Sequence, residues 1–279
     1  MIDRFAQLPR ALKERTEFVQ LAGETSPYGE AVPALVAHPE ERWQDGGVSA
    51  VPFVLWMHGR TVNKELDPGR YLRWIRAGIG VCAIDLPGHG ERFDRSAQIS
   101  RQTLVVAEQA SHETDFVLDD LRERFGDAFD FSRIGIGGMS AGGMVTMIRC
   151  CRAHPFSCAA VEASIGNFDF LKGRESYVEE LAQKLNPIAH LERWKPIPFL
   201  ALHSEIDEWI PVQGMRTFVE ELGNKYRSAG VDDGMVRMHT WPETGAPYEH
   251  AGFGKVSNEA KNLQQDFFRE HLFGNVAVP

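Results

Sequence analysis

The chain has 279 residues, of which 43% are hydrophobic and 25% are charged, as in ordinary soluble globular proteins. Its net charge is −9 and it contains no basic run, so we expect neither nucleic acid nor a membrane as a partner. The longest apolar run, residues 51–57, is too short to cross a bilayer, and residues 1–10 lack the apolar core of a signal peptide.

Eight segments have the composition of β-strands. They are residues 16–21, 31–38, 51–57, 79–84, 134–139, 158–163, 199–202 and 236–241. Helical spacing of apolar residues is found in residues 67–77, 102–125, 144–152, 214–226 and 256–272. Residues 1–15 are expected to form a surface helix or arm. This alternation predicts one α/β domain over residues 1–279, with a mostly parallel sheet of about eight strands covered by helices on both faces.

Residues 168–194 interrupt the alternation of strands and helices. Within them, Ser176 and Glu179 have the spacing of a capping box, which predicts the start of a short helix.

Four cysteines occur in the chain, and none has the spacing of a metal ligand: Cys82, Cys150, Cys151 and Cys158. Two of them are adjacent, which makes a poor disulfide framework. We interpret all four as reduced thiols in or near the core, which favours a cytoplasmic protein. Asp85 and His89 would supply two metal ligands but no third, so we expect no metal and no cofactor.

Residues 138–142 read Gly-Met-Ser-Ala-Gly and lie between a predicted strand and a predicted helix. This is the Gly-x-Ser-x-Gly pattern of a nucleophile elbow, in which a serine sits at the tip of a sharp turn and its neighbours must be small. A dinucleotide fingerprint is excluded because Ser140 stands where glycine is needed, and a phosphate-binding loop because Gly143 replaces lysine. A glycine-rich strand end with a buried serine remains the alternative.

A serine nucleophile needs a base and an acid, which in parallel sheets gather beyond the carboxyl ends of strands. His250 lies in the loop between the last predicted strand and the final helix, so it is the leading candidate for the base. Asp207 follows the strand at 199–202 and is the candidate acid, with Glu205 and Glu208 as neighbouring alternatives. Its other possible role is to cap the next turn.

Four segments carry a resemblance to a known family. They are residues 55–60 (Leu-Trp-Met-His-Gly-Arg), 85–92 (Asp-Leu-Pro-Gly-His-Gly-Glu-Arg), 138–142, and 202–207 (Leu-His-Ser-Glu-Ile-Asp) followed by Pro211. The chain resembles the α/β-hydrolase superfamily, specifically the dienelactone hydrolase and prolyl-oligopeptidase-like branch of serine hydrolases, and the second segment is similar to bacterial esterase-like members. The chain order Ser140, Asp207, His250 is that of α/β-hydrolases. Dienelactone hydrolases carry cysteine at the elbow, so serine disfavours that activity.

The resemblance implies an α/β-hydrolase fold with a small lid insertion at residues 166–194. It also implies an oxyanion hole made by the backbone N–H groups of Arg60 and Ala141. The Arg60 side chain is not needed for this role and is expected either to point at solvent or to meet a substrate carboxylate. Five lid residues wall a substrate pocket or cover the core, and both alternatives stay open: Phe168, Phe170, Leu171, Tyr177 and Leu181.

We therefore expect a serine carboxylesterase that hydrolyses a small, soluble ester through an acyl-enzyme on Ser140. A serine peptidase or amidase of the prolyl-oligopeptidase-like branch is the first alternative, and a non-catalytic binding protein on the same fold is the second. A lipase is less favoured because the expected lid is short.

Overall fold

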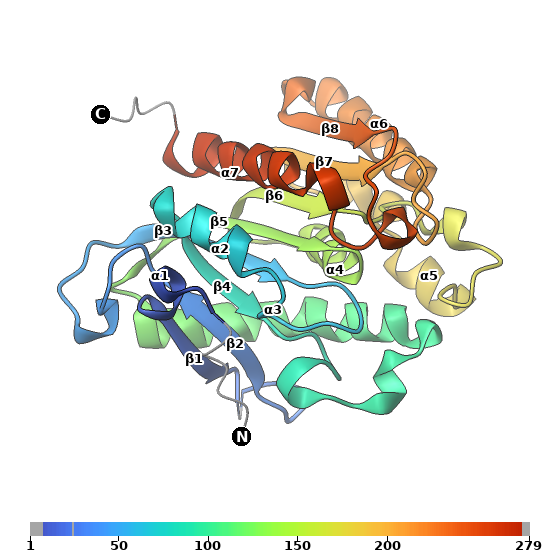
Figure 1. Cartoon of the computed structure of the whole chain (residues 1–279). Coiled ribbons are helices and arrows are strands. Elements are labelled where there is room, and N and C mark those ends of the chain that lie inside the picture. Colours follow the sequence, from blue (N-terminus) through green and yellow to red (C-terminus); the bar gives the residue numbers. More distant parts are fainter. Residues whose placement is uncertain (1–7, 24, 275–279) are drawn as a thin grey trace.

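An eight-stranded sheet runs through the part of the chain that the computed structural model describes, residues 8–23 and 25–274 (Figure 1). The strand order is β1-β2-β4-β3-β5-β6-β7-β8. Strand β2 pairs antiparallel with both β1 and β4, and all other pairs are parallel. The strands are β1 (Thr16–Leu21), β2 (Val32–Ala37), β3 (Val51–Met57), β4 (Gly80–Ile84), β5 (Phe129–Met139), β6 (Phe156–Glu162), β7 (Phe199–Ser204) and β8 (Val236–Trp241).

All eight predicted strand segments form strands of this sheet, so the predicted α/β-hydrolase architecture is confirmed. The largest boundary difference is in β5, which begins at Phe129 rather than at residue 134. Of the extra residues, Phe129 is buried and Phe131 is partly buried, but the polar Asp130, Ser132 and Arg133 interrupt them, so no continuous apolar run marks this part of the strand. Phe129 nevertheless pairs with Val51 at the start of β3.

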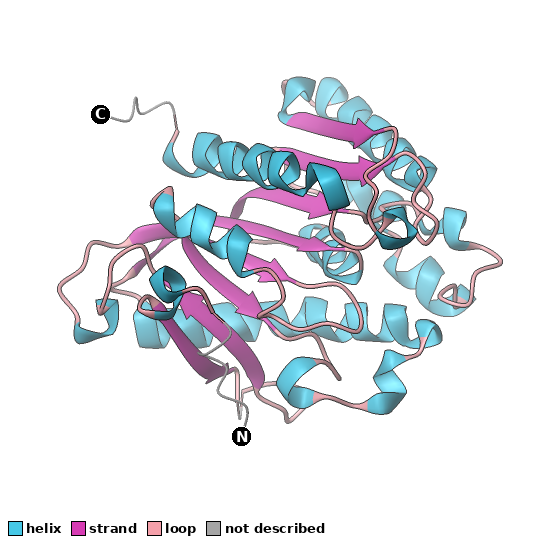
Figure 2. Cartoon of the chain, viewed as in Figure 1, coloured by secondary structure: helices cyan, strands magenta, loops and turns pink. Residues whose placement is uncertain are grey.

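Helices cover both faces of the sheet (Figure 2). They are α1 (Arg10–Lys13), α2 (Pro68–Arg76), α3 (Thr103–Phe125), α4 (Ala141–Cys150), α5 (Glu179–Leu185), α6 (Val212–Ser228) and α7 (Ser257–Phe273). One apolar core lies between the sheet and helices α3 to α6, and a second lies between the sheet and helices α1, α2 and α7. Strand β3 serves both cores because Leu55 faces the first and Trp56 the second.

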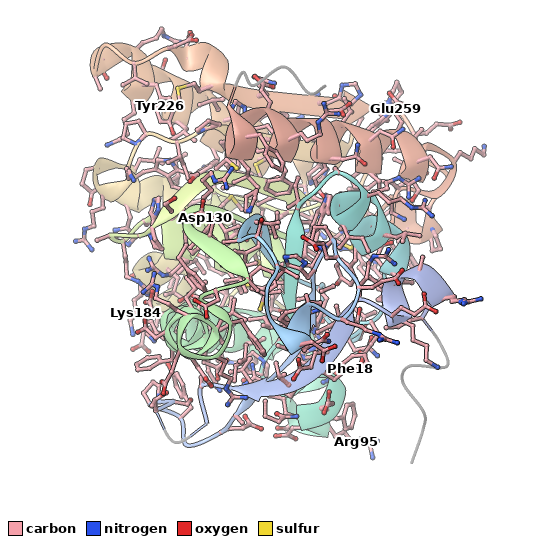
Figure 3. All side chains as sticks on the ribbon, turned by 90° about the vertical axis from the view of Figure 1, so that its left-hand side faces the viewer. Phe18, Arg95, Asp130, Lys184, Tyr226 and Glu259 are labelled. Carbon is pink, nitrogen blue, oxygen red and sulfur yellow. The ribbon has the colours of Figure 1, made fainter. Side chains whose placement is uncertain are left out.

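Figure 3 shows Phe18 of β1 and Tyr226 of α6, the helix that packs against β7 and β8, at opposite ends of the molecule. All four cysteines are buried and free. No helix within the described ranges is long and apolar enough to cross a membrane. Of the predicted helix or arm at residues 1–15, residues 1–7 lie outside the described part of the chain. Residues 8–15 contain the short helix α1.

The segment between β6 and β7 corrects one prediction. Helix α5 begins at Glu179, and Val178 occupies its N-cap position. No side chain caps the helix, so the predicted capping box of Ser176 and Glu179 is wrong. The reason is a preceding turn, in which the N–H of Tyr177 donates to the carbonyl of Arg174 at 3.0 Å. Ser176 is enclosed in this turn and cannot stand at the helix start.

Candidate active site

Ser140 lies in the sharp turn between β5 and α4. Its backbone angles are φ 52° and ψ −115°, a strained conformation for a residue with a side chain. The turn is held by the N–H of Ser140, which donates to the carbonyl of Glu162 at 2.8 Å. A Cβ at Gly138 would lie 2.4 Å from the carbonyl carbon of Gly142, and one at Gly142 would lie 2.2 Å from the carbonyl oxygen of Met57. The two glycines are therefore required by close backbone packing.

The side chains of Ser140, His250 and Asp207 form a continuous chain of contacts. His250 Nε2 lies 2.9 Å from Ser140 Oγ, and His250 Nδ1 lies 2.7 Å from Asp207 Oδ2. The side chains of His250 and Asp207 are 3% and 0% exposed, so solvent screens their contact little. With its N–H on Nδ1 donating to Asp207, the imidazole presents Nε2 to the serine proton.

Asp207 is the acidic residue of its loop that contacts His250. Its other oxygen, Oδ1, accepts the N–H groups of Trp209 at 2.9 Å and Ile210 at 2.8 Å, so the carboxylate also caps the turn that follows. Glu205 instead pairs with Arg216, and Glu208 is exposed. The capping and histidine-orienting roles, which were alternatives in the sequence, are thus combined in one carboxylate.

Glu249 anchors the loop that carries His250, and the sequence analysis missed it. Its Oε2 accepts hydrogen bonds from Ser204 Oγ at 2.8 Å and from Thr244 N–H at 2.6 Å, while Oε1 accepts from Gly245 N–H at 2.7 Å. Desolvation by itself raises the pKa of Glu249, but these hydrogen bonds outweigh it and lower the pKa to about 2. The only signal in the sequence was that Glu249 immediately precedes His250.

The two predicted oxyanion donors belong to segments that both lie next to the nucleophile. Ala141 is the first residue of α4, so its N–H has no carbonyl partner within the helix. A Cβ at Gly59 would lie 3.5 Å from Ser140 Cβ, which places the loop of Gly59 and Arg60 beside the serine. The roles of the Arg60 and Ala141 N–H groups remain predictions.

The Arg60 side chain is half-buried, in contrast to the solvent-directed orientation considered above. Its Nη2 donates to the carbonyl of Gln98, and its Nε is buried without a partner among the described residues. Burial lowers the pKa of the guanidinium. The side chain lines the cavity beside Ser140.

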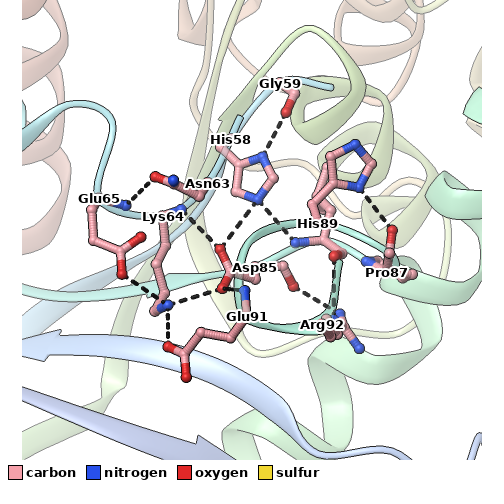
Figure 4. Close-up of polar contacts among 12 residues, drawn as sticks. His58, Gly59, Asn63, Lys64, Glu65, Asp85, Pro87, His89, Glu91 and Arg92 are labelled. Carbon is pink, nitrogen blue, oxygen red and sulfur yellow. Dashed lines mark hydrogen bonds and ion pairs between the residues drawn. The ribbon is translucent and has the colours of Figure 1, made fainter. Parts of the chain in front are cut away.

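A buried cluster of charged side chains lies next to His58, at the start of the loop at residues 58–62 (Figure 4). Lys64 Nζ, which is fully buried, lies 2.9 Å from Asp85 Oδ2 and 2.6 Å from Glu91 Oε1. Asp85 Oδ1 also accepts the Lys64 N–H at 2.9 Å. His58 Nε2 accepts the N–H of Leu86 at 3.0 Å, which ties the end of β3 to the loop after β4.

This cluster is not arranged as a metal site. Asp85 is occupied by Lys64, and His89 turns away from it, with Nδ1 2.8 Å from the carbonyl of Pro87. Within the described part of the chain, no group of three or more His, Cys, Asp or Glu residues is placed to hold a metal ion. The imidazoles of His58 and His89 instead contact loop backbone, at Leu86 and Pro87.

A second buried ion pair lies at the cavity wall, where Arg70 and Asp67 are lining residues. Arg70 Nη1 lies 2.6 Å from Glu162 Oε1, and Nη2 lies 2.8 Å from Oε2 and 3.0 Å from Asp67 Oδ2. The guanidinium also stacks over Trp56, 4.4 Å from the ring centre. Because Glu162 accepts the Ser140 N–H through its carbonyl, this pair stiffens the strand end that holds the nucleophile.

A cavity of about 870 Å³ opens beside Ser140 and His250, within the usual size range of small-molecule sites. Arg174, Glu175 and Ser176 of the predicted lid line it. The five apolar lid residues do not: Phe168 and Leu171 are fully buried in the core, Tyr177 and Leu181 pack against that core, and Phe170 is exposed. Of the two alternatives for these five, covering the core fits four of them.

Comparison with known proteins places the chain among hydrolases. The model of the prolyl oligopeptidase family matches residues 70–274. The chain is 25% identical over 268 residues to esterase YjfP of Escherichia coli (strain K12), a match that covers 86% of this chain and 96% of that protein.

Solved structures share the fold. The Pyrococcus furiosus esterase Pf2001 superposes with a TM-score of 0.66 at 15% identity, covering 95% of both chains. A puromycin-hydrolyzing peptidase of Mycobacterium tuberculosis superposes with a TM-score of 0.70 at 20% identity over 95% of this chain. The present chain spans 40% of the length of that peptidase.

The fold and the family match together define a serine hydrolase of the α/β-hydrolase superfamily. Because the family model covers most of its length, the chain belongs to the prolyl oligopeptidase family.

Proposed function

We propose that the protein is a serine carboxylesterase that hydrolyses small, soluble carboxylic esters. The observation that carries the proposal is the unbroken contact from Ser140 Oγ through the His250 imidazole to Asp207. The match to esterase YjfP over nearly the whole of that protein supports ester bonds as the target. The four free, buried cysteines support a reducing compartment such as the cytoplasm.

The reaction proceeds in two acyl-transfer steps. His250 Nε2 takes the proton of Ser140 Oγ while the oxygen attacks the ester carbonyl, and Asp207 stabilises the imidazolium. The N–H groups of Ala141 and Arg60 hold the oxyanion, each worth about 3 kcal/mol of the barrier. The tetrahedral intermediate collapses, and His250 gives its proton to the departing alcohol.

In the second step, water replaces the alcohol. His250 takes a proton from the water as its oxygen attacks the acyl carbon. Collapse then releases the carboxylic acid and returns the proton to Ser140. No cofactor or metal is needed for either step.

Amide hydrolysis is the second candidate, because the chain belongs to the prolyl oligopeptidase family and shares its fold with a peptidase. A p-nitrophenyl ester and a p-nitroanilide of the same short acid separate the two activities. We expect cleavage of the ester and no measurable cleavage of the anilide, whereas clear cleavage of the anilide would favour the amidase.

A fluorophosphonate probe tests the nucleophile directly. We expect labelling of the wild type and none of Ser140→Ala, whose turnover should be lost while its circular dichroism is unchanged. Ser157→Ala, a substitution at the start of β6, serves as the matched control and should label fully. A folded wild-type sample that does not label would favour the non-catalytic binding protein.

A further inference from the structure

Trp209 is an exposed tryptophan that lies directly against the candidate base. The residue is 47% exposed, and its ring centre lies 4.9 Å from that of His250 with the planes at 41°. It forms part of the wall of the cavity beside Ser140. A large aromatic surface left open next to the reacting groups is available to a substrate.

Three contacts fix Trp209 in place, two through the backbone of its loop and one through the indole. The backbone N–H of Trp209 donates to Asp207 Oδ1 at 2.9 Å, so the residue is fixed to the acid of the triad. Tyr248 stacks on the indole, with ring centres 4.8 Å apart and planes at 26°. The N–H of Glu208 donates to the Tyr248 carbonyl at 3.1 Å, which ties the two loops together. Binding to such a preorganised surface costs little ordering.

Only one ring of this stacked pair faces the cavity. Trp209 is a cavity-lining residue, whereas Tyr248 is not among the described residues that line it. Tyr248 therefore supports the indole from the side away from the cavity. Its backbone φ of 56° is unusual for a tyrosine.

The mechanism decides which part of a substrate reaches Trp209. His250 Nε2 must give its proton to the leaving-group oxygen, which therefore lies within about 3 Å of that nitrogen. Because the indole lies against the same imidazole, the first atoms beyond the leaving oxygen come within its reach. The carbonyl oxygen is turned toward the N–H groups of Ala141 and Arg60, so the acyl chain takes the remaining position on the reacting carbon.

We propose that Trp209 is a specificity-determining residue that binds the leaving group, and that the substrates are esters of flat, aromatic alcohols. The inference rests on the proposed esterase function and names the alcohol side of its substrates. Stacking of two aromatic rings contributes binding free energy beyond that of burying their surface, and this extra free energy corresponds to about a two- to tenfold preference in rate.

The test compares benzyl and cyclohexylmethyl esters of one short acid, whose alcohols match in size and differ in flatness. Each kcat/KM is divided by the rate of hydroxide-catalysed hydrolysis of the same ester, which removes intrinsic reactivity. We expect the wild type to favour the benzyl ester about fivefold, Trp209→Leu to show no preference, and Trp209→Phe to keep most of it. Ile206→Ala removes another exposed apolar side chain of the same loop outside the cavity, and it should keep the wild-type ratio.

Three results would overturn the inference. One is a wild type that cleaves both esters equally, and another is a Trp209→Leu variant that keeps the preference. The third is a Trp209→Leu variant that loses kcat equally on both esters, because the indole would then only position His250. If the wild type cleaves neither ester and does not react with the fluorophosphonate probe, the esterase proposal itself has failed and this inference falls with it.

Discussion

Replacing Gly142 with alanine tests how closely α4 must approach the end of β3. The new Cβ would lie 2.2 Å from the Met57 carbonyl oxygen and 2.7 Å from that of His58. Both are backbone atoms that cannot rotate away. Since ordinary contact needs about 3.4 Å, the helix and the loop after β3 must move apart by about 1 Å.

This movement separates the two proposed oxyanion donors, because Ala141 belongs to the helix and Arg60 to the loop. Loss of one such donor typically lowers kcat about a hundredfold or more. Overpacking of this kind also destabilises by about 1–3 kcal/mol, which lowers Tm by roughly 2–10 °C in a chain of this size. We therefore expect Gly142→Ala to stay folded at room temperature but to lose about 99% of kcat.

The assay is kcat and KM on a p-nitrophenyl ester well below Tm, with Tm from circular dichroism. Gly223→Ala is the matched control, because this glycine lies inside α6 and its new Cβ would meet only Arg227 Nη1 at 3.7 Å. The control should keep full activity and gain about 0.4–1 kcal/mol of stability. Wild-type kcat in Gly142→Ala would refute the reasoning that this close approach sets the oxyanion geometry.

Three further predictions concern other parts of the molecule. Glu249→Gln removes the negative charge that accepts the hydrogen bonds of the His250 loop, so kcat on esters should fall roughly tenfold with KM little changed. An unchanged kcat would show that the loop does not need this carboxylate. Burial lowers the pKa of His89 from 6.5 to about 4. At pH values between these two, the unfolded chain binds more protons than the folded chain, so the free energy of unfolding decreases as the pH falls. Urea titrations at about pH 7 and about pH 5 should therefore show a smaller loss of unfolding free energy in His89→Gln than in the wild type, and equal losses would contradict this cause. Tyr226→Phe removes a buried hydroxyl that bonds the Ile197 N–H at 2.8 Å, the Ile197 carbonyl at 2.6 Å and the Trp194 Nε1–H at 3.0 Å. Urea unfolding should show about 2–3 kcal/mol of destabilisation with esterase activity unchanged, and a smaller cost would mean that water replaces the hydroxyl.

The site residues differ in how much of the sequence around them is needed to predict their role. Ser140 was found from a five-residue pattern, because a sharp turn packed against a neighbouring strand excludes side chains at fixed positions. Asp207 and His250 were found from their places after predicted strands, because parallel strands present their carboxyl ends at one edge. Glu249, Trp209 and Lys64 had no comparable signal, since each acts through partners that no short motif contains.

The sequence by itself determined the succession of strands and helices along the chain, the burial of the sheet on both faces and the position of the nucleophile. These follow from apolar periodicity and from glycine sterics, which act between residues close together in the chain. Only the tertiary structure decided that Asp207 rather than its glutamate neighbours meets His250, that the imidazole reaches a serine 110 residues away, and that Trp209 flanks it. Those contacts depend on how loops from separate strands pack at one edge, and hydrogen bonds of a few ångströms are set by that packing alone.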